Sequence, residues 1–198
     1  MHILWPIGKD RRLCEFNLSE SSVAEGLKLS GRTAVEQRAQ PTAMALLPSF
    51  GDEQFILLAN RANKLRLVNS STKMCRRVVK GPRPQLDEDA ASAARILPLP
   101  GPPPRTHPAD AARHGLLLCG REVVLSRLPP SGTAGGYAAQ QASAERADDV
   151  AVSHDGSCCF VLSRADESVL QLAIDLGAYE VKSDARVSNM EKIRNFIS

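Results

Sequence analysis

The sequence predicts an all-β fold, a partial β-propeller of three to four blades with a short C-terminal helix. A strand–turn–strand unit recurs four times along the 198 residues, at intervals near the roughly 40 to 50 residues of a propeller blade. Each copy combines a continuous apolar run, a polar turn and a run of alternating apolar and polar residues. That pattern is typical of paired antiparallel strands and not of a helix.

The four copies share an apolar first strand and a turn made of Gly, Asn, Asp or Arg. They lie at residues 2–17, 55–69, 115–128 and 159–172. An immunoglobulin-like sandwich would share the short strands, but it would not explain a repeat of this kind.

Further strands are predicted around three of the hairpins, each next to a turn signal. They lie at 42–47, 93–97 and 149–153, ahead of the hairpins, and at 74–79, behind the second one. The four strands between 42 and 79 make one complete blade, which is a four-stranded sheet.

The propeller segment is expected to span 1–176, with loop inserts near 98–113 and 129–147. The first insert is rich in Pro, which cannot donate a hydrogen bond to a sheet, and the second lacks any apolar period. We therefore expect the second insert to be a mobile connection. Residues 177–198 are predicted to form a tail with a short helix, because Ser188 and Glu191 fit a capping box.

The composition excludes several kinds of protein. Only 4% of the residues are aromatic, which argues against base-stacking RNA readers and ring-lined pockets. The five cysteines show no CxxC spacing, so we expect reduced, mostly buried thiols and neither a metal nor another cofactor. No apolar run approaches the roughly 18 residues that span a bilayer, so a soluble intracellular protein without membrane contact is expected.

Cations are concentrated between residues 61 and 83, where the sequence has no acidic residue. One interpretation is a docking stripe for an acidic partner, with nucleic acid as the second choice. The other is a set of solvated strand faces, since Lys64 and Arg66 alternate with leucines. The predicted partner-binding residues are Arg61, Lys64, Arg66, Lys73, Arg76, Arg77 and Lys80, and Arg83 ends the run.

Catalysis is not expected. Three histidines, His107, His114 and His154, could be imagined in a hydrolytic triad, but no GxSxG turn is present to hold a nucleophile. The glycine-rich stretch at 131–136 lacks the Lys and the following helix of a phosphate-binding loop. The chain is therefore predicted not to be an enzyme.

Several segments together resemble a known family. They are residues 8–11, 32–37, 55–60, 69–76 with Gly81 and Pro82, and 150–156. They are similar to the last blades of the ciliary WD-repeat subunits of the calmodulin- and spoke-associated complex, at the base of a radial spoke. The most specific part is Thr72 to Arg76, and the remainder is general WD-repeat sequence.

This resemblance implies a structural scaffold of the cilium or flagellum axoneme, part of the cytoskeleton, without catalytic residues. The implied partners are other axonemal proteins: radial spoke base components, subunits of the same complex and doublet microtubule tubulin. A WD-repeat adaptor in a ribonucleoprotein or other intracellular complex is the alternative. The family's earlier blades and its calcium-sensor-like extension are absent from this sequence.

Three or four blades leave unpaired strand edges. We therefore expect a second chain, or a longer parent chain, to complete the propeller.

Overall fold

The structure of the protein is a computed structural model. It describes residues 3–35, 38–47, 49, 52–82, 92–100, 113–130 and 137–188. Within these residues every regular element is a β-strand, and the strands form four separate antiparallel sheets, each built from strands consecutive in the chain.

Blade 1 is a three-stranded sheet in the order β1-β2-β3, and blade 2 is a four-stranded sheet in the order β4-β5-β6-β7. The strands of blade 1 are β1 (Ile3–Leu4), β2 (Arg12–Ser22) and β3 (Gly26–Ala34). Those of blade 2 are β4 (Pro41–Leu46), β5 (Phe55–Asn60), β6 (Lys64–Asn69) and β7 (Cys75–Lys80).

Blades 3 and 4 repeat the four-stranded arrangement. Blade 3 contains β8 (Arg95–Pro98), β9 (Arg113–Cys119), β10 (Glu122–Leu128) and β11 (Tyr137–Gln141). Blade 4 contains β12 (Asp149–Val152), β13 (Cys158–Ser163), β14 (Ser168–Asp175) and β15 (Glu180–Ser188).

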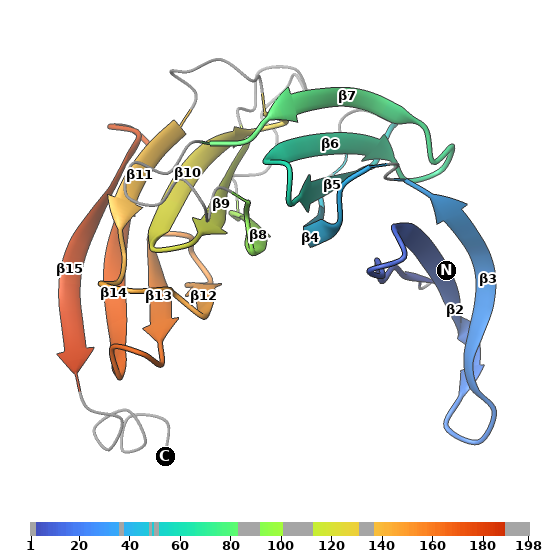
Figure 1. Ribbon diagram of the computed structural model, residues 1–198, viewed down its shortest axis with the longest axis horizontal. Coiled ribbons are helices and arrows are strands. Elements are labelled where there is room, and N and C mark those ends of the chain that lie inside the picture. Colours follow the sequence, from blue (N-terminus) through green and yellow to red (C-terminus); the bar gives the residue numbers. More distant parts are fainter. Residues whose placement is uncertain are drawn as a thin grey trace.

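The four blades follow one another around an arch (Figure 1). Strands β4, β8 and β12 lie along the inner side, and β3, β7, β11 and β15 along the outer side. Blades 1 and 4 form the two ends of the arch, and the open side lies between them. The predicted all-β partial propeller of three to four blades is confirmed, and the described residues form four blades.

The hydrophobic core lies between consecutive blades. One cluster joins blades 3 and 4 through residues such as Leu118 and Val161, and a second joins blades 2 and 3 through Leu57 and Leu117. A third cluster, which contains fewer of the described residues than the other two, joins Leu13 of blade 1 to blade 2. The middle strands are therefore apolar on both faces, because each face contacts a different neighbouring blade.

The outer strands depart from the sequence prediction in two places. Strand β11 lies inside the segment 129–147, which was expected to be a mobile connection, yet its residues pair with β10 from Glu122 to Ser126. Strand β15 extends the propeller segment beyond 176, into the expected tail, and pairs with β14 along its whole length. Backbone hydrogen bonds to the neighbouring strand, and not an apolar pattern, define both strands.

The predicted helix falls outside the described residues apart from Ser188, which is the last residue of β15. Residues 101–112 of the first predicted insert also lie outside them.

The cysteines are all free thiols. Cys119 and Cys159 are buried, and burial raises the pKa of each to about 12. Cys14 and Cys158 are partly exposed, and Cys75 is exposed. The expectation of mostly buried thiols therefore holds for two of the five. Cys75 is the most exposed, because it lies on the outer strand β7.

Candidate functional site

The turns of the four central hairpins all lie at the same end of the blades, because every sheet is a meander that runs in the same order. We call this end the turn rim. Each turn presents an arginine: Arg11 between β1 and β2, Arg61 between β5 and β6, Arg121 between β9 and β10, and Arg164 between β13 and β14. The rim therefore repeats one cation per blade.

The connections between blades are hydrogen-bonded to these turns. Val35 N donates to the carbonyl of Arg11 at 3.3 Å, and Arg61 N donates to the carbonyl of Gln40 at 2.9 Å. Ala142 N donates to the carbonyl of Arg121 at 2.8 Å. Since both partners in each bond are backbone groups, the arginine side chains are placed on a fixed backbone frame.

The β5–β6 turn is organised by two asparagines. The side-chain oxygen of buried Asn60 accepts hydrogen bonds from the backbone N–H of Ala62 at 3.1 Å and of Lys64 at 3.0 Å. Asn63 adopts a left-handed backbone with φ of 49° and donates from Nδ2 to the Pro82 carbonyl at 2.9 Å. Asparagine tolerates this conformation better than most residues, so the turn and the chain after β7 are held together.

Lys64 and Lys80 are direct cross-strand partners on β6 and β7, next to this turn. Both side chains are exposed. Like charges placed directly opposite each other destabilise an antiparallel pair. An anionic group bound between them would remove that cost, so the pair fits an acidic ligand or partner.

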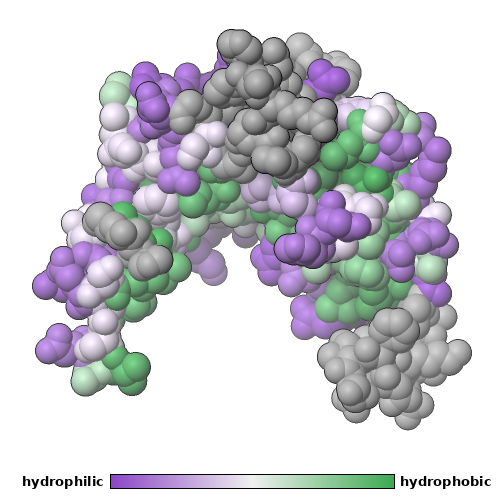
Figure 2. Space-filling model, turned by 180° about the vertical axis from the view of Figure 1, so that it is seen from behind, coloured by the Kyte–Doolittle hydropathy of each residue, from purple (hydrophilic) through white to green (hydrophobic). Residues whose placement is uncertain are grey.

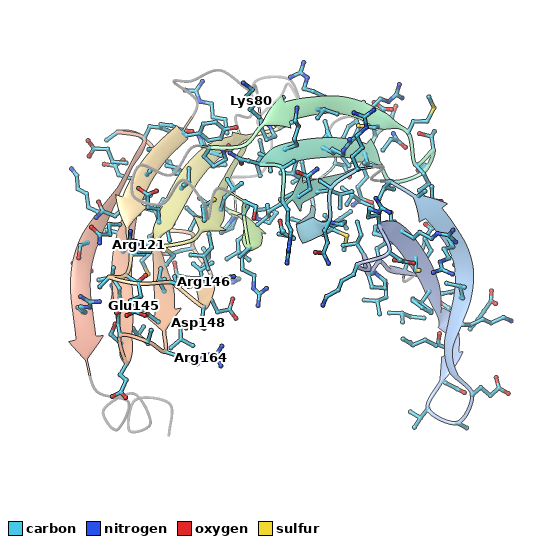
Figure 3. The ribbon with its side chains drawn as sticks, viewed as in Figure 1. Lys80, Arg121, Glu145, Arg146, Asp148 and Arg164 are labelled. Atoms are coloured by element: carbon cyan, nitrogen blue, oxygen red, sulfur yellow. The ribbon has the colours of Figure 1, made fainter. Side chains whose placement is uncertain are left out.

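Further charges extend the turn rim over blades 3 and 4 (Figure 3). Figure 3 shows Arg121, Glu145, Arg146, Asp148 and Arg164 over these two blades, with Lys80 apart from them at the end of β7.

Several of these groups are engaged within the chain. Arg121 donates from Nη1 to the Ala144 carbonyl at 2.9 Å. Arg164 donates to Asp148 from its backbone N–H at 2.7 Å, from Nε at 3.0 Å and from Nη2 at 2.8 Å. These side-chain hydrogen bonds lower the pKa of Asp148 and raise that of Arg164.

The balance of acidic and basic residues on the turn rim differs between blade 4 and blades 2 and 3. Over blade 4, Arg146 and Arg164 are mixed with Glu145, Asp148 and Asp166. Over blades 2 and 3, the described rim residues Arg61, Lys64, Lys80 and Arg121 are accompanied by one acid, Glu122, which is buried. The basic part of the turn rim therefore lies over blades 2 and 3.

The predicted stripe of seven cations is divided by the structure. Arg61, Lys64 and Lys80 lie on the turn rim, whereas Lys73 and Arg76 lie near the opposite end of blade 2. Two others lie within strands: Arg66 is the cross-strand partner of Val78, and Arg77 that of Leu67 on the other face of the sheet. The seven residues therefore do not form one continuous surface.

Lys73 and Arg76 each have an acidic partner within the chain. Arg76 Nη2 lies 2.7 Å from Glu53 Oε1. Lys73, on the loop between β6 and β7, forms an ion pair with Glu15 of blade 1, and its Nζ lies 5.4 Å from the Trp5 ring centroid. These two cations connect parts of the propeller and are less available to a partner.

Arg121, Arg146 and Arg164 were not predicted as site residues from the sequence. Each is a single cation among neutral or acidic neighbours, so a search for runs of charge does not find them. Aligning the four hairpins at their turns would have shown an arginine in every copy.

Neither a cluster of metal ligands nor a helix that could cross a membrane is found among the described residues. None of their His, Cys, Asp and Glu side chains gather in a group of three or more that could hold a metal ion. In the same part of the chain, no helix has the length and apolar character needed to cross a membrane.

No protein family model matches the chain. Two curated proteins match the chain, and both are called cilia- and flagella-associated protein 251. The mouse protein (Mus musculus) is 30% identical over 178 residues, which are 89% of this chain and 13% of that protein. The orangutan protein (Pongo abelii) is 29% identical over 178 residues, 89% of this chain and 14% of that protein. The chain thus spans about an eighth of the length of these relatives.

Among solved structures, the chain is similar to one described as a humanized mutant of the Chaetomium thermophilum Polycomb Repressive Complex 2 bound to the inhibitor GSK126. The TM-score is 0.62 at 10% sequence identity, over 87% of this chain and 35% of that one. At this identity the similarity supports the fold alone. By sequence, this partial propeller is a relative of a stretch of cilia- and flagella-associated protein 251.

Proposed function

We propose that the chain is a non-catalytic scaffold segment of the cilium or flagellum axoneme, acting through protein–protein contacts. The main support is the relationship to cilia- and flagella-associated protein 251 along 89% of the chain. The fold is consistent with this role, since a propeller presents repeated turns on a rigid frame. The finer proposal is docking at the radial spoke base on doublet microtubules.

The basic part of the turn rim is the proposed docking surface. Arg61, Lys64, Lys80 and Arg121 come from two adjacent blades and lie at one end of the propeller. Arg61, Lys64 and Lys80 are exposed, and Arg121 is half-buried. Cations gathered in this way attract an acidic protein surface and fix the orientation of binding. Tubulin is the proposed acidic partner.

Charge reversal tests this surface. A tagged chain carrying Arg61→Glu, Lys64→Glu and Lys80→Glu is expected to bind demembranated axonemes roughly tenfold more weakly, since an exposed ion pair contributes up to about 1 kcal/mol. The measurement is the fraction of tagged protein that sediments with the axonemes over a range of concentrations. The matched control reverses three exposed cations that lie away from the turn rim, Lys28, Arg76 and Lys182, and should bind as the unaltered chain does.

Two results would contradict the proposal. Equal loss of binding in the rim variant and the control would show that the rim is not the docking surface. An unaltered chain that does not bind axonemes would remove the ciliary role itself. If the unaltered chain instead bound RNA with an affinity that falls steeply with salt, the ribonucleoprotein adaptor would be the better assignment.

A further inference from the structure

The outer edge of blade 2 differs in charge from the other outer edges of the described sheets. Strand β7 carries three cations, Arg76, Arg77 and Lys80, and no acid. Strand β11 has no charged residue, and the cations of β3 and β15 each form an ion pair with an acid of their own blade. On β7 only Arg76 has such a partner, Glu53. The edge of blade 2 therefore carries an excess of positive charge.

Two of the β7 cations are not balanced by an acid of the described chain. Arg77 and Lys80 are exposed, and neither forms an ion pair with a described residue. Lys80 also lies directly opposite Lys64 on β6. Seen from behind in Figure 2, this outer side of the arch, at the upper left, carries mainly hydrophilic residues. The edge is therefore exposed and suited to an acidic partner.

The backbone of β7 directs hydrogen-bonding groups away from its own sheet. Gly81 N donates to the carbonyl of Asn63 at 2.9 Å, at the end of the β6–β7 pairing. Hydrogen-bonded and non-hydrogen-bonded pairs alternate along antiparallel strands. Counted from Gly81, the backbone N–H and C=O groups of Val78 and Lys80 therefore point away from β6. Such groups at a sheet edge are the ones with which an added strand pairs.

The chain that follows β7 turns away from this edge. Asn63 Nδ2 donates to the Pro82 carbonyl at 2.9 Å, and Gly81 and Pro82 are both buried. The chain is thus held beside the β5–β6 turn and does not run back along β7. Tyr137 of blade 3 donates its hydroxyl to the Lys80 carbonyl at 3.1 Å. The N–H and C=O of Val78 and the N–H of Lys80 are left for a further strand.

The side chains of β7 determine which strand could be added. Val78 and Lys80 lie on one face of blade 2 and Arg77 on the other, because side chains alternate along a strand. Val78 is 44% exposed. Opposite charges stabilise a cross-strand pair, and like charges destabilise it. An added strand therefore needs acids opposite Arg77 and Lys80 and an aliphatic side chain opposite Val78.

We propose that β7 binds an acidic segment of another protein, which pairs with it as an additional antiparallel strand of blade 2. Read in its own direction, the segment has the order acid, any residue, aliphatic residue, acid, opposite residues 80, 79, 78 and 77. The cations of β7 repel a second copy of the same edge, so the pairing is selective for acidic strands. This inference does not depend on the turn rim, and its test uses Arg77 and Val78, which lie outside that surface.

The test is the binding of a fluorescent peptide with the core Glu-Thr-Val-Glu to the complete chain, measured by anisotropy. The peptide should bind, and its counterpart Lys-Thr-Val-Lys should not. Arg77→Glu should weaken binding about tenfold, since it replaces an exposed ion pair by a repulsion. Lys182→Glu, on the outer strand β15, is the matched control and should bind as the unaltered chain does.

Methylated peptides distinguish strand pairing from general charge attraction. In the proposed register the N–H of the peptide valine donates to the Val78 carbonyl, and the N–H of the peptide threonine points away from β7. Methylation of the valine nitrogen should weaken binding at least about tenfold, because it removes a hydrogen bond and places a methyl group in the pairing. Methylation of the threonine nitrogen should leave the affinity unchanged.

Val78→Pro removes the matching donor from the chain itself. Proline is tolerated at a sheet edge where the N–H points away from the sheet, so β7 should remain paired with β6. The variant should bind the peptide about tenfold more weakly. Circular dichroism of the Val78→Pro and Arg77→Glu variants confirms that the sheets remain folded.

Three results with the peptides would overturn the proposal. The first is an unaltered chain that does not bind Glu-Thr-Val-Glu, which would mean that the cations only keep the edge unpaired. The second is equal binding of the two methylated peptides, which would show charge attraction without strand pairing. The third is equal binding by the unaltered chain and Arg77→Glu, which would place the peptide elsewhere.

Two other occupants of the edge would also overturn it. The sequence has an acidic run of its own at Asp87, Glu88 and Asp89. If the peptide bound only after these three residues were changed to their amides, the chain's own acids would be the occupant. If a short RNA bound more tightly than the peptide and Arg77→Glu abolished its binding, the edge would be a phosphate-binding surface.

Discussion

Leu118→Ala is expected to lower the free energy of unfolding by about 2 to 5 kcal/mol, the usual range for removing a buried leucine side chain and leaving a cavity. Leu118 is 0% exposed and belongs to the cluster between blades 3 and 4. Its cross-strand partner is Val123, which is also buried there. The loss of contacts therefore weakens the joint between two blades and not only one sheet. Chemical denaturation measures the change.

The control for this prediction is Leu176→Ala in the β14–β15 turn, where the side chain is 36% exposed. A surface substitution of this kind usually changes stability by about 0.5 kcal/mol or less. If both variants lost the same free energy of unfolding, blades 3 and 4 could not be packed as described.

Lys73→Ala is expected to lower the free energy of unfolding by about 1 to 3 kcal/mol, because it removes hydrogen bonds to a partly buried charge. The Lys73 and Glu15 side chains are only 15% and 20% exposed, and they join blade 2 to blade 1. Trp5 Nε1 also donates to Glu15 at 2.8 Å. Lys28→Ala is the control, since its ion pair with Glu20 is exposed and should contribute about 0 to 1 kcal/mol.

The ion pair between Lys73 and Glu15 also predicts that the stability of the protein depends on pH. Burial would raise the pKa of Glu15, but the hydrogen bonds from Lys73 and Trp5 outweigh it and leave the pKa below its ordinary value of 4.5. The stabilisation is therefore complete above that value and is lost as the pH falls through the lowered pKa of the folded state. Below pH 5, the free energy of unfolding measured by denaturation should fall less steeply with decreasing pH in Glu15→Gln than in the unaltered chain. If the free energy of unfolding fell equally steeply with pH in both proteins, the stabilising role of Glu15 would be contradicted.

The sequence could predict the inner and middle strands because packing determines their composition. The apolar runs at 55–60 and 116–119 are buried on both faces, so they stand out as strands without any structure. The outer strands β3, β11 and β15 could not be found in this way. They are exposed or partly exposed along most of their length, and backbone pairing holds them in place with the help of few buried side chains, such as Val181 of β15.

The candidate site was predictable only in part, for a similar reason. Arg61, Lys64 and Lys80 belong to a run of cations and were found, but the same run included Lys73, which the fold commits to Glu15. Arg121 and Arg164 are separated by more than 40 residues, and the meander order of the sheets brings both to the turn rim. Proximity of this kind depends on the blades and not on local composition.

The three core clusters each link one blade to the next, so the molecule behaves as a short linear array whose cohesion resides at the joints. An internal blade is held by two joints and an end blade by one. Blade 1 also has the smallest described cluster. Amide protons should consequently exchange fastest in blade 1 and slowest in blades 2 and 3, with opening that begins by fraying from the ends.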